Sequence, residues 1–297
     1  MSVPAAYIGI ILIWSTTPLA IQWSSNEVGF LFGITSRMIL GILGGLLVAG
    51  LFNIRLPWHT AARRTYLAAG LGLFLAMTSV YWSAQFIPSG WVSVLFGLAP
   101  IITGAMASFW LAEQALTPAR VTGMLLGLAG LAIMLLGSQQ LGQRAVYGIA
   151  GMVFSVTAYS ASAIAVKRIA ADIPALATTI GALAVTVPLL LLVCILTGEP
   201  LPARVPARAA ISIIYLGLVG SVLGFAMYYY VLSHVAATRV ALITLITPIT
   251  ALLLGHVLNG EALQAEALAG SATILSGLLL FEYGQQAGRW VRDTMIG

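Results

Sequence analysis

Polar and aromatic side chains recur at helical spacing inside apolar stretches of this chain, where they could bind a small molecule. Thr78, Tyr81, Trp82 and Gln85 follow one another at intervals that place all four on one face of a helix. Such a face can stack on a flat ligand and form hydrogen bonds with it. The alternative is helix packing combined with an aromatic belt at a membrane interface.

A second candidate group surrounds a proline in the first apolar run. Trp14, Thr17 and Pro18 lie within five residues of one another. Proline inside a helix frees a backbone carbonyl and kinks the axis, and neighbouring hydroxyls can satisfy the freed groups. We therefore expect a binding site or hinge at this point, with a fixed structural kink as an equally good interpretation.

Four further residues belong to the candidate binding site. Ser155 and Tyr159 share one helical face, because four positions separate them. Tyr228 begins a run of three tyrosines, of which at most two can face inward together. Trp91 opens an apolar run and could either gate the mouth of a cavity or anchor the helix at the membrane surface; anchoring is the preferred interpretation.

The composition requires a membrane to surround these residues. Of 297 residues, 60% are apolar and 7% are charged, with a mean hydropathy of +1.03. A soluble chain of this length needs more charge to cover its surface, so a polytopic all-α membrane protein is expected, in contact with the lipid bilayer. The net charge of +5 does not indicate nucleic acid, because the basic residues lie between the apolar runs.

The chain carries no recognisable set of catalytic or metal-binding residues. Cys194 is the single cysteine, which excludes an internal disulfide and a cysteine metal cluster. Neither G-x-S-x-G nor H-E-x-x-H occurs in the sequence. We therefore expect no enzyme activity, no cofactor and no metal.

Ten apolar runs are long enough to cross a bilayer, which takes about 20 residues each. The expected spans are Pro4–Trp23, Gly29–Phe52, Tyr66–Phe86, Trp91–Ala112, Pro118–Gly137, Ala145–Val166, Pro174–Thr197, Ala209–Ser233, Arg239–Leu258 and Gln264–Tyr283. The link between the third and fourth runs is very short, so these helices are expected to be antiparallel neighbours.

The second half of the chain repeats landmarks of the first. Pro100 precedes Glu113 by thirteen positions, and Pro248 precedes Glu261 by the same distance. Thr247 lies beside the second proline and is a further candidate binding residue. Two interruptions at matching positions in the two halves point to the place where a substrate passes, so Pro100 and Pro248 are predicted kinks or hinges.

A duplication of five helices has a consequence for orientation. Because five is odd, the second copy enters the membrane from the opposite side, which gives inverted repeats of the kind that permit alternating access. We place the first repeat at residues 1–140 and the second at residues 141–297 of one integrated domain. The glycines that follow each glutamate, Gly123 and Gly130 in one copy and Gly270 and Gly277 in the other, predict close helix packing.

The distribution of basic residues predicts that both termini are cytoplasmic. Nine basic residues then fall in inner loops and the tail, and three in outer loops. The inner set is Arg55, Arg63, Arg64, Arg120, Lys167, Arg168, Arg239, Arg289 and Arg292, and the outer set is Arg144, Arg204 and Arg208.

Arg37 remains as a charge inside the membrane. An unpaired arginine there costs at least about 2.5–3.5 kcal/mol on insertion scales. Pairing between helices is favoured over a contact with a substrate carboxylate, and the side chain could also reach toward the interface. Glu113 and Glu261 are predicted to cap the helices that follow them, and His256 is predicted to find a backbone or hydroxyl partner.

These features together resemble the ten-helix EamA-type members of the drug/metabolite transporter superfamily. The resemblance is carried by Trp14, Arg37 and the two proline–glutamate pairs, and it covers nearly the whole chain. It implies a bacterial inner-membrane exporter of amino acids or related metabolites. The aromatic candidates make exporters of aromatic amino acids the nearest branch of that family.

The leading hypothesis is export of amino acids with aromatic or large neutral side chains by a monomer with a cavity at the midplane. A multidrug or cation efflux permease is the first alternative, although the first helix lacks the acid that small multidrug pumps use. A membrane scaffold or receptor is the alternative from another class, but it leaves the duplication unexplained.

Overall fold

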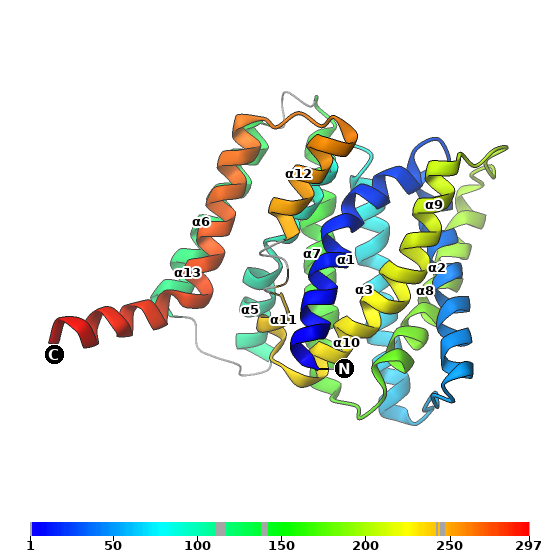
Figure 1. Ribbon diagram of the computed structural model, residues 1–297, viewed down its shortest axis with the longest axis horizontal. Helices are drawn as coiled ribbons and strands as arrows, with labels where there is room; N and C mark the ends of the chain where they lie inside the picture. The colour runs from blue at the N-terminus through cyan, green and yellow to red at the C-terminus, as the bar shows by residue number, and fades with distance from the viewer. Residues whose placement is uncertain (1, 111–116, 138–141, 242, 244–246, 297) are drawn as a thin grey trace.

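A computed structural model describes residues 2–110, 117–137, 142–241, 243 and 247–296, and every regular element within these ranges is a helix (Figure 1). Glu113 lies outside the described residues. Seven of the helices or helix pairs are long and apolar enough to cross a membrane, and three shorter apolar helices bring the number to ten. The protein is thus an all-α, multi-pass membrane protein.

The first repeat contains four spans and one interrupted span. They are α1 (Val3–Ser25), α2 (Phe30–Leu51), α3 (Thr60–Ser83), the interrupted pair α4 (Ser89–Phe96) and α5 (Ala99–Trp110), and α6 (Pro118–Gly137). The second repeat begins with α7 (Ala145–Ile169) and α8 (Ala175–Thr197).

The rest of the second repeat is more irregular. Its third span is α9 (Ala207–Tyr215), the π-helix η2 (Leu216–Leu223) and α10 (Gly224–His234) in succession; α11 (Ala237–Ala241), α12 (Thr247–Asn259) and α13 (Ala265–Ile296) follow. The last helix continues well beyond the predicted span, which ended at Tyr283.

The fourth span of each repeat is broken near its proline. Pro100 is the second residue of α5, and Pro248 is the second residue of α12. Proline lacks an N–H group and is favoured in the first turn of a helix, where that group has no intrahelical partner. Gly97 donates its N–H to the carbonyl of Val94, which closes α4 just before the break. Both prolines therefore begin a new helical segment at the same place in their repeats.

The two repeats pack into each other across the molecule. α12 packs on α4 and α11 on α5, so the two broken spans lie side by side, while α3 packs against α7 and α8. The prediction that the third and fourth spans are antiparallel neighbours is wrong, because α3 and α4 make almost no contact. A short link brings the ends of two helices together but does not decide which faces are complementary.

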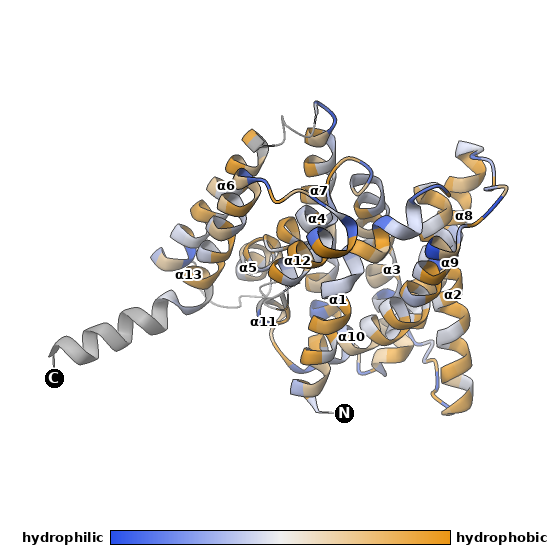
Figure 2. Cartoon of the chain, turned by 45° about the horizontal axis from the view of Figure 1, so that its top comes forward, coloured by the Kyte–Doolittle hydropathy of each residue, from blue (hydrophilic) through white to orange (hydrophobic). Residues whose placement is uncertain are grey.

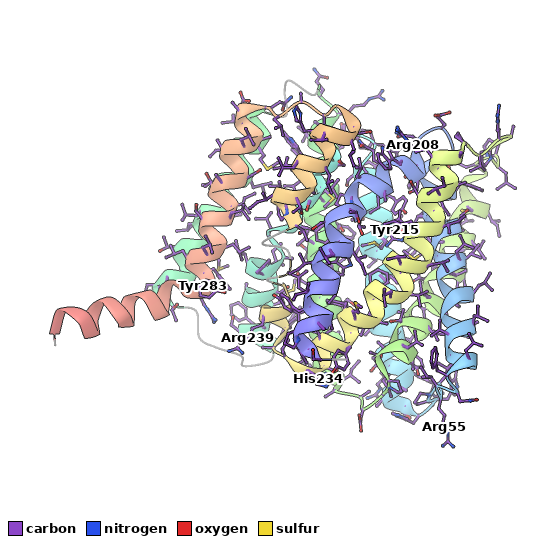
Figure 3. The ribbon with its side chains drawn as sticks, viewed as in Figure 1. Arg55, Arg208, Tyr215, His234, Arg239 and Tyr283 are labelled. Carbon is purple, nitrogen blue, oxygen red and sulfur yellow. The ribbon has the colours of Figure 1, made fainter. Side chains whose placement is uncertain are left out.

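The two repeats are oriented in opposite directions. In Figure 1, α1 rises from the N-terminus at the lower edge, whereas α7 descends from the upper edge, and α13 returns the chain to the lower side. Arg55, His234 and Arg239 lie on this lower side, and Arg208 lies on the opposite one (Figure 3). Figure 2 shows hydrophobic residues along the helices and hydrophilic ones mainly in the connecting segments, which is the pattern of a protein surrounded by lipid.

Candidate functional site

A cavity lies where the first helices of the two repeats meet the broken spans. Its wall contains five of the predicted residues, Trp14, Thr17, Pro18, Tyr159 and Thr247. It holds about 60 Å³ of space for the centres of water-sized molecules. That is room for roughly four waters.

The cavity is bordered by a cluster of aromatic rings from both repeats. Trp14 of α1 and Tyr159 of α7 meet edge to face, with ring centroids 6.1 Å apart. Tyr228 of α10 contacts both rings, at 5.5 Å from Trp14 and 5.3 Å from Tyr159. Phe96 of α4 approaches Tyr159 at 6.0 Å. These edge-to-face and tilted contacts form an apolar wall that can accept another flat ring.

Pro18 shapes the α1 side of the wall. It supplies no N–H for the carbonyl of Trp14, one turn earlier, and the helix around it is supported by hydroxyl groups. Thr17 donates to the carbonyl of Ile13 at 2.9 Å, and Ser15 donates to the carbonyl of Ile11 at 2.7 Å. Ser15 also accepts a hydrogen bond from Thr250 of α12 at 2.7 Å, which ties the broken span of the second repeat to α1.

Arg37 brings a positive charge to this otherwise neutral wall. Its side chain lines the cavity and is only 2% exposed, so it does not reach toward the membrane surface. Nε donates to the hydroxyl of Ser221 in η2 at 3.0 Å, which is the predicted contact between helices. The guanidinium carbon lies 5.9 Å from the ring centroid of Tyr81. Nη1 has no hydrogen-bond partner within the described part of the chain.

The residues predicted on one face of α3 are distributed over different surroundings. Tyr81 is buried and accepts a hydrogen bond from Ser24 at 3.3 Å, and the buried hydroxyl of Thr78 has no partner among the described residues. Trp82 is 36% exposed and packs against Phe86, so it lies outside the cavity wall.

Gln85, Trp91 and Ser155 also lie away from the cavity wall. Gln85 is exposed, and Nε2 donates to the carbonyl of Trp82 at 3.3 Å. Ser155 is buried and donates to the carbonyl of Ala76 at 2.8 Å, which joins α7 to α3. Trp91 is 1% exposed. The preferred interpretation of Trp91 as an interface anchor is therefore wrong, because an anchor presents its ring to the lipid headgroups.

Glu261 joins the two repeats on the side of the molecule that carries Arg208. Its carboxylate accepts hydrogen bonds from the backbone of Ser89 and Gly90 at 3.1 and 3.2 Å and from the Ser89 hydroxyl at 2.7 Å. Glu261 thus caps α4 of the other repeat. The prediction that it caps α13, the helix that follows it, is wrong. The packing of α12 on α4 brings the first turn of α4 within reach of Glu261.

The Glu261 contacts extend to α1 through Asn259. Asn259 donates to Glu261 at 3.0 Å and to Gln22 at 2.8 Å, and its carbonyl oxygen accepts from Trp23 at 2.9 Å. Nδ1 of His256 lies 2.9 Å from the Glu261 carbonyl, which confirms the predicted backbone partner. The predicted cap from Glu113 falls outside the described residues.

The sequence patterns did not predict three polar or aromatic lining residues. Ser93 and Phe96 come from α4 and Phe225 from α10. A signal for the first two was present, because Ser89, Ser93 and Phe96 recur at intervals of four and three residues and share one helical face. Phe225 also had such a signal, because it precedes Tyr228 and Tyr229 by three and four positions.

Comparison with known proteins shows the same two-part organisation. The EamA-like transporter family matches residues 4–136 and again residues 146–283. A "Probable terminal-alkyne amino-acid exporter" from Streptantibioticus cattleyicolor is 26% identical over 280 residues, covering 90% of this chain and 92% of that protein. A "Probable amino-acid metabolite efflux pump" from Salmonella typhimurium is 33% identical over 82 residues, which is 28% of this chain and 27% of the pump.

A solved crystal structure shares the fold over nearly the whole length. It superposes with a TM-score of 0.70 at 21% identity and covers 95% of this chain and 98% of its own.

Proposed function

The chain belongs to the EamA-like transporter family, and we propose that it exports amino acids with aromatic or large neutral side chains through the cavity at Trp14 and Tyr159. The observation that carries this proposal is the composition of the wall. It combines an aromatic cluster from both repeats with hydroxyl groups and one arginine, and no acidic side chain is among the described lining residues.

The charge of the wall favours a zwitterion or an anion over a cation. A cationic drug would meet the guanidinium of Arg37 without a carboxylate to offset the repulsion. A multidrug or cation efflux permease remains the alternative, because an apolar aromatic wall also accepts drug-sized rings. A scaffold or receptor would have no use for a cavity shared between inverted repeats.

The names of two relatives agree with this substrate class. They describe an amino-acid exporter and an amino-acid metabolite efflux pump in those organisms. The longer match is only 26% identical, so these names support amino acids as the chemical class. The preference for aromatic or large neutral side chains is argued from the cavity wall.

The proposed mechanism is alternating access by a monomer in the inner membrane, with both termini cytoplasmic. The Glu261 contacts tie α12 to α4 and α1 on the Arg208 side of the cavity. On the opposite side, the Tyr7 hydroxyl donates to the carbonyl of Arg239 at 2.9 Å, which ties α1 to α11. Separating one set of contacts while the other persists would open the cavity to one side at a time.

Purified full-length protein in liposomes tests the proposal. Vesicles loaded with unlabelled L-phenylalanine should accumulate external labelled L-phenylalanine by exchange, and excess L-tryptophan or L-leucine should compete. Empty vesicles and vesicles loaded with sucrose control for leakage. Exchange of a cationic dye without exchange of any neutral amino acid would overturn the proposal in favour of the drug-efflux alternative.

A further inference from the structure

Arg37 is the one charged side chain among the described residues that line the cavity. It comes from α2 and is 2% exposed, so water solvates its guanidinium very little. Among the described residues, no carboxylate lies within ion-pair distance of it, and Glu261 is engaged with Ser89, Gly90 and Asn259.

The hydrogen-bonding capacity of the guanidinium is only partly used. An arginine side chain has five N–H donors in a planar fork. Nε donates to Ser221, whereas Nη1 is buried without an acceptor within the described ranges. A carboxylate can accept two parallel hydrogen bonds from such a fork, a pairing that is stronger than a bond between neutral groups. The unused donors therefore fit an anionic group inside the cavity.

The surrounding helices hold Arg37 in place. The Tyr81 ring lies against the guanidinium, and Tyr81 is fixed in turn by the hydroxyl of Ser24. On the other side, a β-carbon added at Gly217 would lie 3.1 Å from the Arg37 carbonyl, and one added at Gly220 would lie 3.4 Å from Nη2. The glycines belong to the π-helix η2, and π-helical segments within longer α-helices are frequent at functional sites.

We infer that Arg37 binds the carboxylate of the transported molecule, while the aromatic cluster at Trp14 and Tyr159 receives its side chain. The ligand class is a monocarboxylate with an aromatic or large apolar group, whether an amino acid or a simple carboxylic acid. This inference rests on the proposed transport function and adds the residue that selects the carboxylate.

Binding of the carboxylate by Arg37 has a direct consequence for selectivity. A ligand that lacks a carboxylate would enter the cavity and leave the buried guanidinium without an anionic acceptor for its paired N–H groups. Sites built to bond one polar group reject analogues that lack it, because their own buried donors are then unsatisfied. The protein should therefore distinguish ligands by the carboxylate more strongly than by the amino group.

Four analogues that share the 2-phenylethyl skeleton test this with the unmodified protein. L-phenylalanine has both groups, 3-phenylpropionate only the carboxylate, and L-phenylalaninamide and phenethylamine only the amine. Binding is measured by ligand-dependent thermal stabilisation of the detergent-solubilised full chain. The two carboxylates should bind at least about tenfold more tightly than the two amines. Equal binding of L-phenylalanine and L-phenylalaninamide would overturn the inference.

The comparison also separates the two sources of a carboxylate. If L-phenylalanine binds more tightly than 3-phenylpropionate, the ligand is an amino acid whose ammonium is also recognised. If the two bind equally, the carboxylate alone is recognised. Both results support a role for Arg37, and they differ only in which monocarboxylate is carried.

Variants test whether Arg37 causes the preference for carboxylates over amines. In Arg37→Gln the tenfold preference for carboxylates should shrink to about twofold or less. Arg37→Lys keeps the charge without the planar fork and should retain part of the preference. Ser221→Ala is the matched control, because it removes the partner of Nε and leaves the guanidinium. A full preference that survives in Arg37→Gln would overturn the inference, and if that variant does not fold, the analogue series still decides.

Failure of the inference differs from failure of the proposed function. Exchange of L-phenylalanine in liposomes together with equal binding of its amide refutes the role of Arg37 but leaves the amino-acid exporter. Selective binding of 3-phenylpropionate together with no exchange of any amino acid refutes the proposed function but leaves the carboxylate site.

Discussion

Trp14 and Tyr159 come from the first helix of each repeat, and their rings meet at the cavity. An arrangement in which each repeat contributes one ring lets the wall change shape when the repeats move, without unfolding either helix. Tyr228 contacts both rings and so keeps them together from the side of α10. The aromatic cluster is therefore placed where a movement of one repeat relative to the other alters the fit to a substrate.

Two tryptophans provide a matched test of the aromatic wall. Trp14→Ala should lower the rate of L-phenylalanine exchange at least about tenfold, because it removes a ring that borders the cavity. Trp82→Ala should change the rate by no more than about twofold, since Trp82 is 36% exposed and outside the wall. Initial exchange rates at equal amounts of reconstituted protein provide the measurement, and similar losses in both variants would contradict the assignment.

The sequence predicted part of this site for a physical reason. Trp14, Thr17 and Pro18 surround a disrupted helix turn. Such a turn faces the protein interior or a cavity, because lipid offers no hydrogen-bond partners for the freed backbone groups. On α3 the helical spacing gave a face but not its orientation. The residues of α3 that line the cavity are Met77 and Val80, which lie on the opposite side of Tyr81 from Trp82.

At the scale of elements, small residues set how closely helices approach. α6 and α13 cross at glycines, as the repeated glycines of the sequence predicted: a β-carbon on Gly123 would lie 2.5 Å from the Gly277 carbonyl, and one on Gly130 would lie 2.7 Å from the Gly270 carbonyl. Backbones this close leave no space for a side chain. The glycines in the landmark pattern therefore specify the contact between the last helices of the two repeats.

Gly277 and Gly50 make a matched pair for testing this contact. Gly277→Ala places a methyl group 2.6 Å from the Gly123 carbonyl, so the helices must separate at a cost of about 1–3 kcal/mol. Gly50→Ala, also within a helix, meets nothing within 4 Å and should be neutral or slightly stabilising. The midpoint of thermal unfolding in detergent distinguishes them, and equal midpoints would mean that α6 and α13 do not cross at these glycines.

Glu261 gives a second prediction at this scale. Glu261→Ala removes the acceptor for the first N–H groups of α4 and should destabilise the protein by about 1 kcal/mol. Glu261→Gln keeps one acceptor oxygen and should lose less stability.

The same contact can be tested for closure of the cavity. Thr17→Cys, in a chain lacking Cys194, should react faster with a small thiol reagent from the Arg208 side when Glu261→Ala is also present. An unchanged reaction rate would show that this contact does not close the cavity.

At the scale of the whole molecule, the number of spans and the matching breaks could be predicted, because they depend on the length of apolar runs and on proline. The neighbours of each helix could not. α3 packs against α7 and α8 of the other repeat, and its fit includes Gly70, where a β-carbon would lie 2.5 Å from the β-carbon of Val185. Such a fit depends on the surfaces of both helices, so the residues of one helix do not identify its partner. The division of the repeats near residue 140 stays a prediction.

The direction of the protein in the membrane provides the last prediction. Arg55 lies on the side of the N-terminus and Arg208 on the opposite side (Figure 3), so the charge bias predicts a cytoplasmic Arg55. In a Cys194→Ala background, Arg55→Cys should react with an impermeant maleimide only in inverted vesicles, and Arg204→Cys only in intact cells. The second position is exposed in the segment that leads to Arg208. Because the two repeats are inverted, the opposite pattern would leave the cavity unchanged but exchange its inner and outer sides. The Glu261 contacts would then close the cytoplasmic side, and the Tyr7–Arg239 contact would close the outer one.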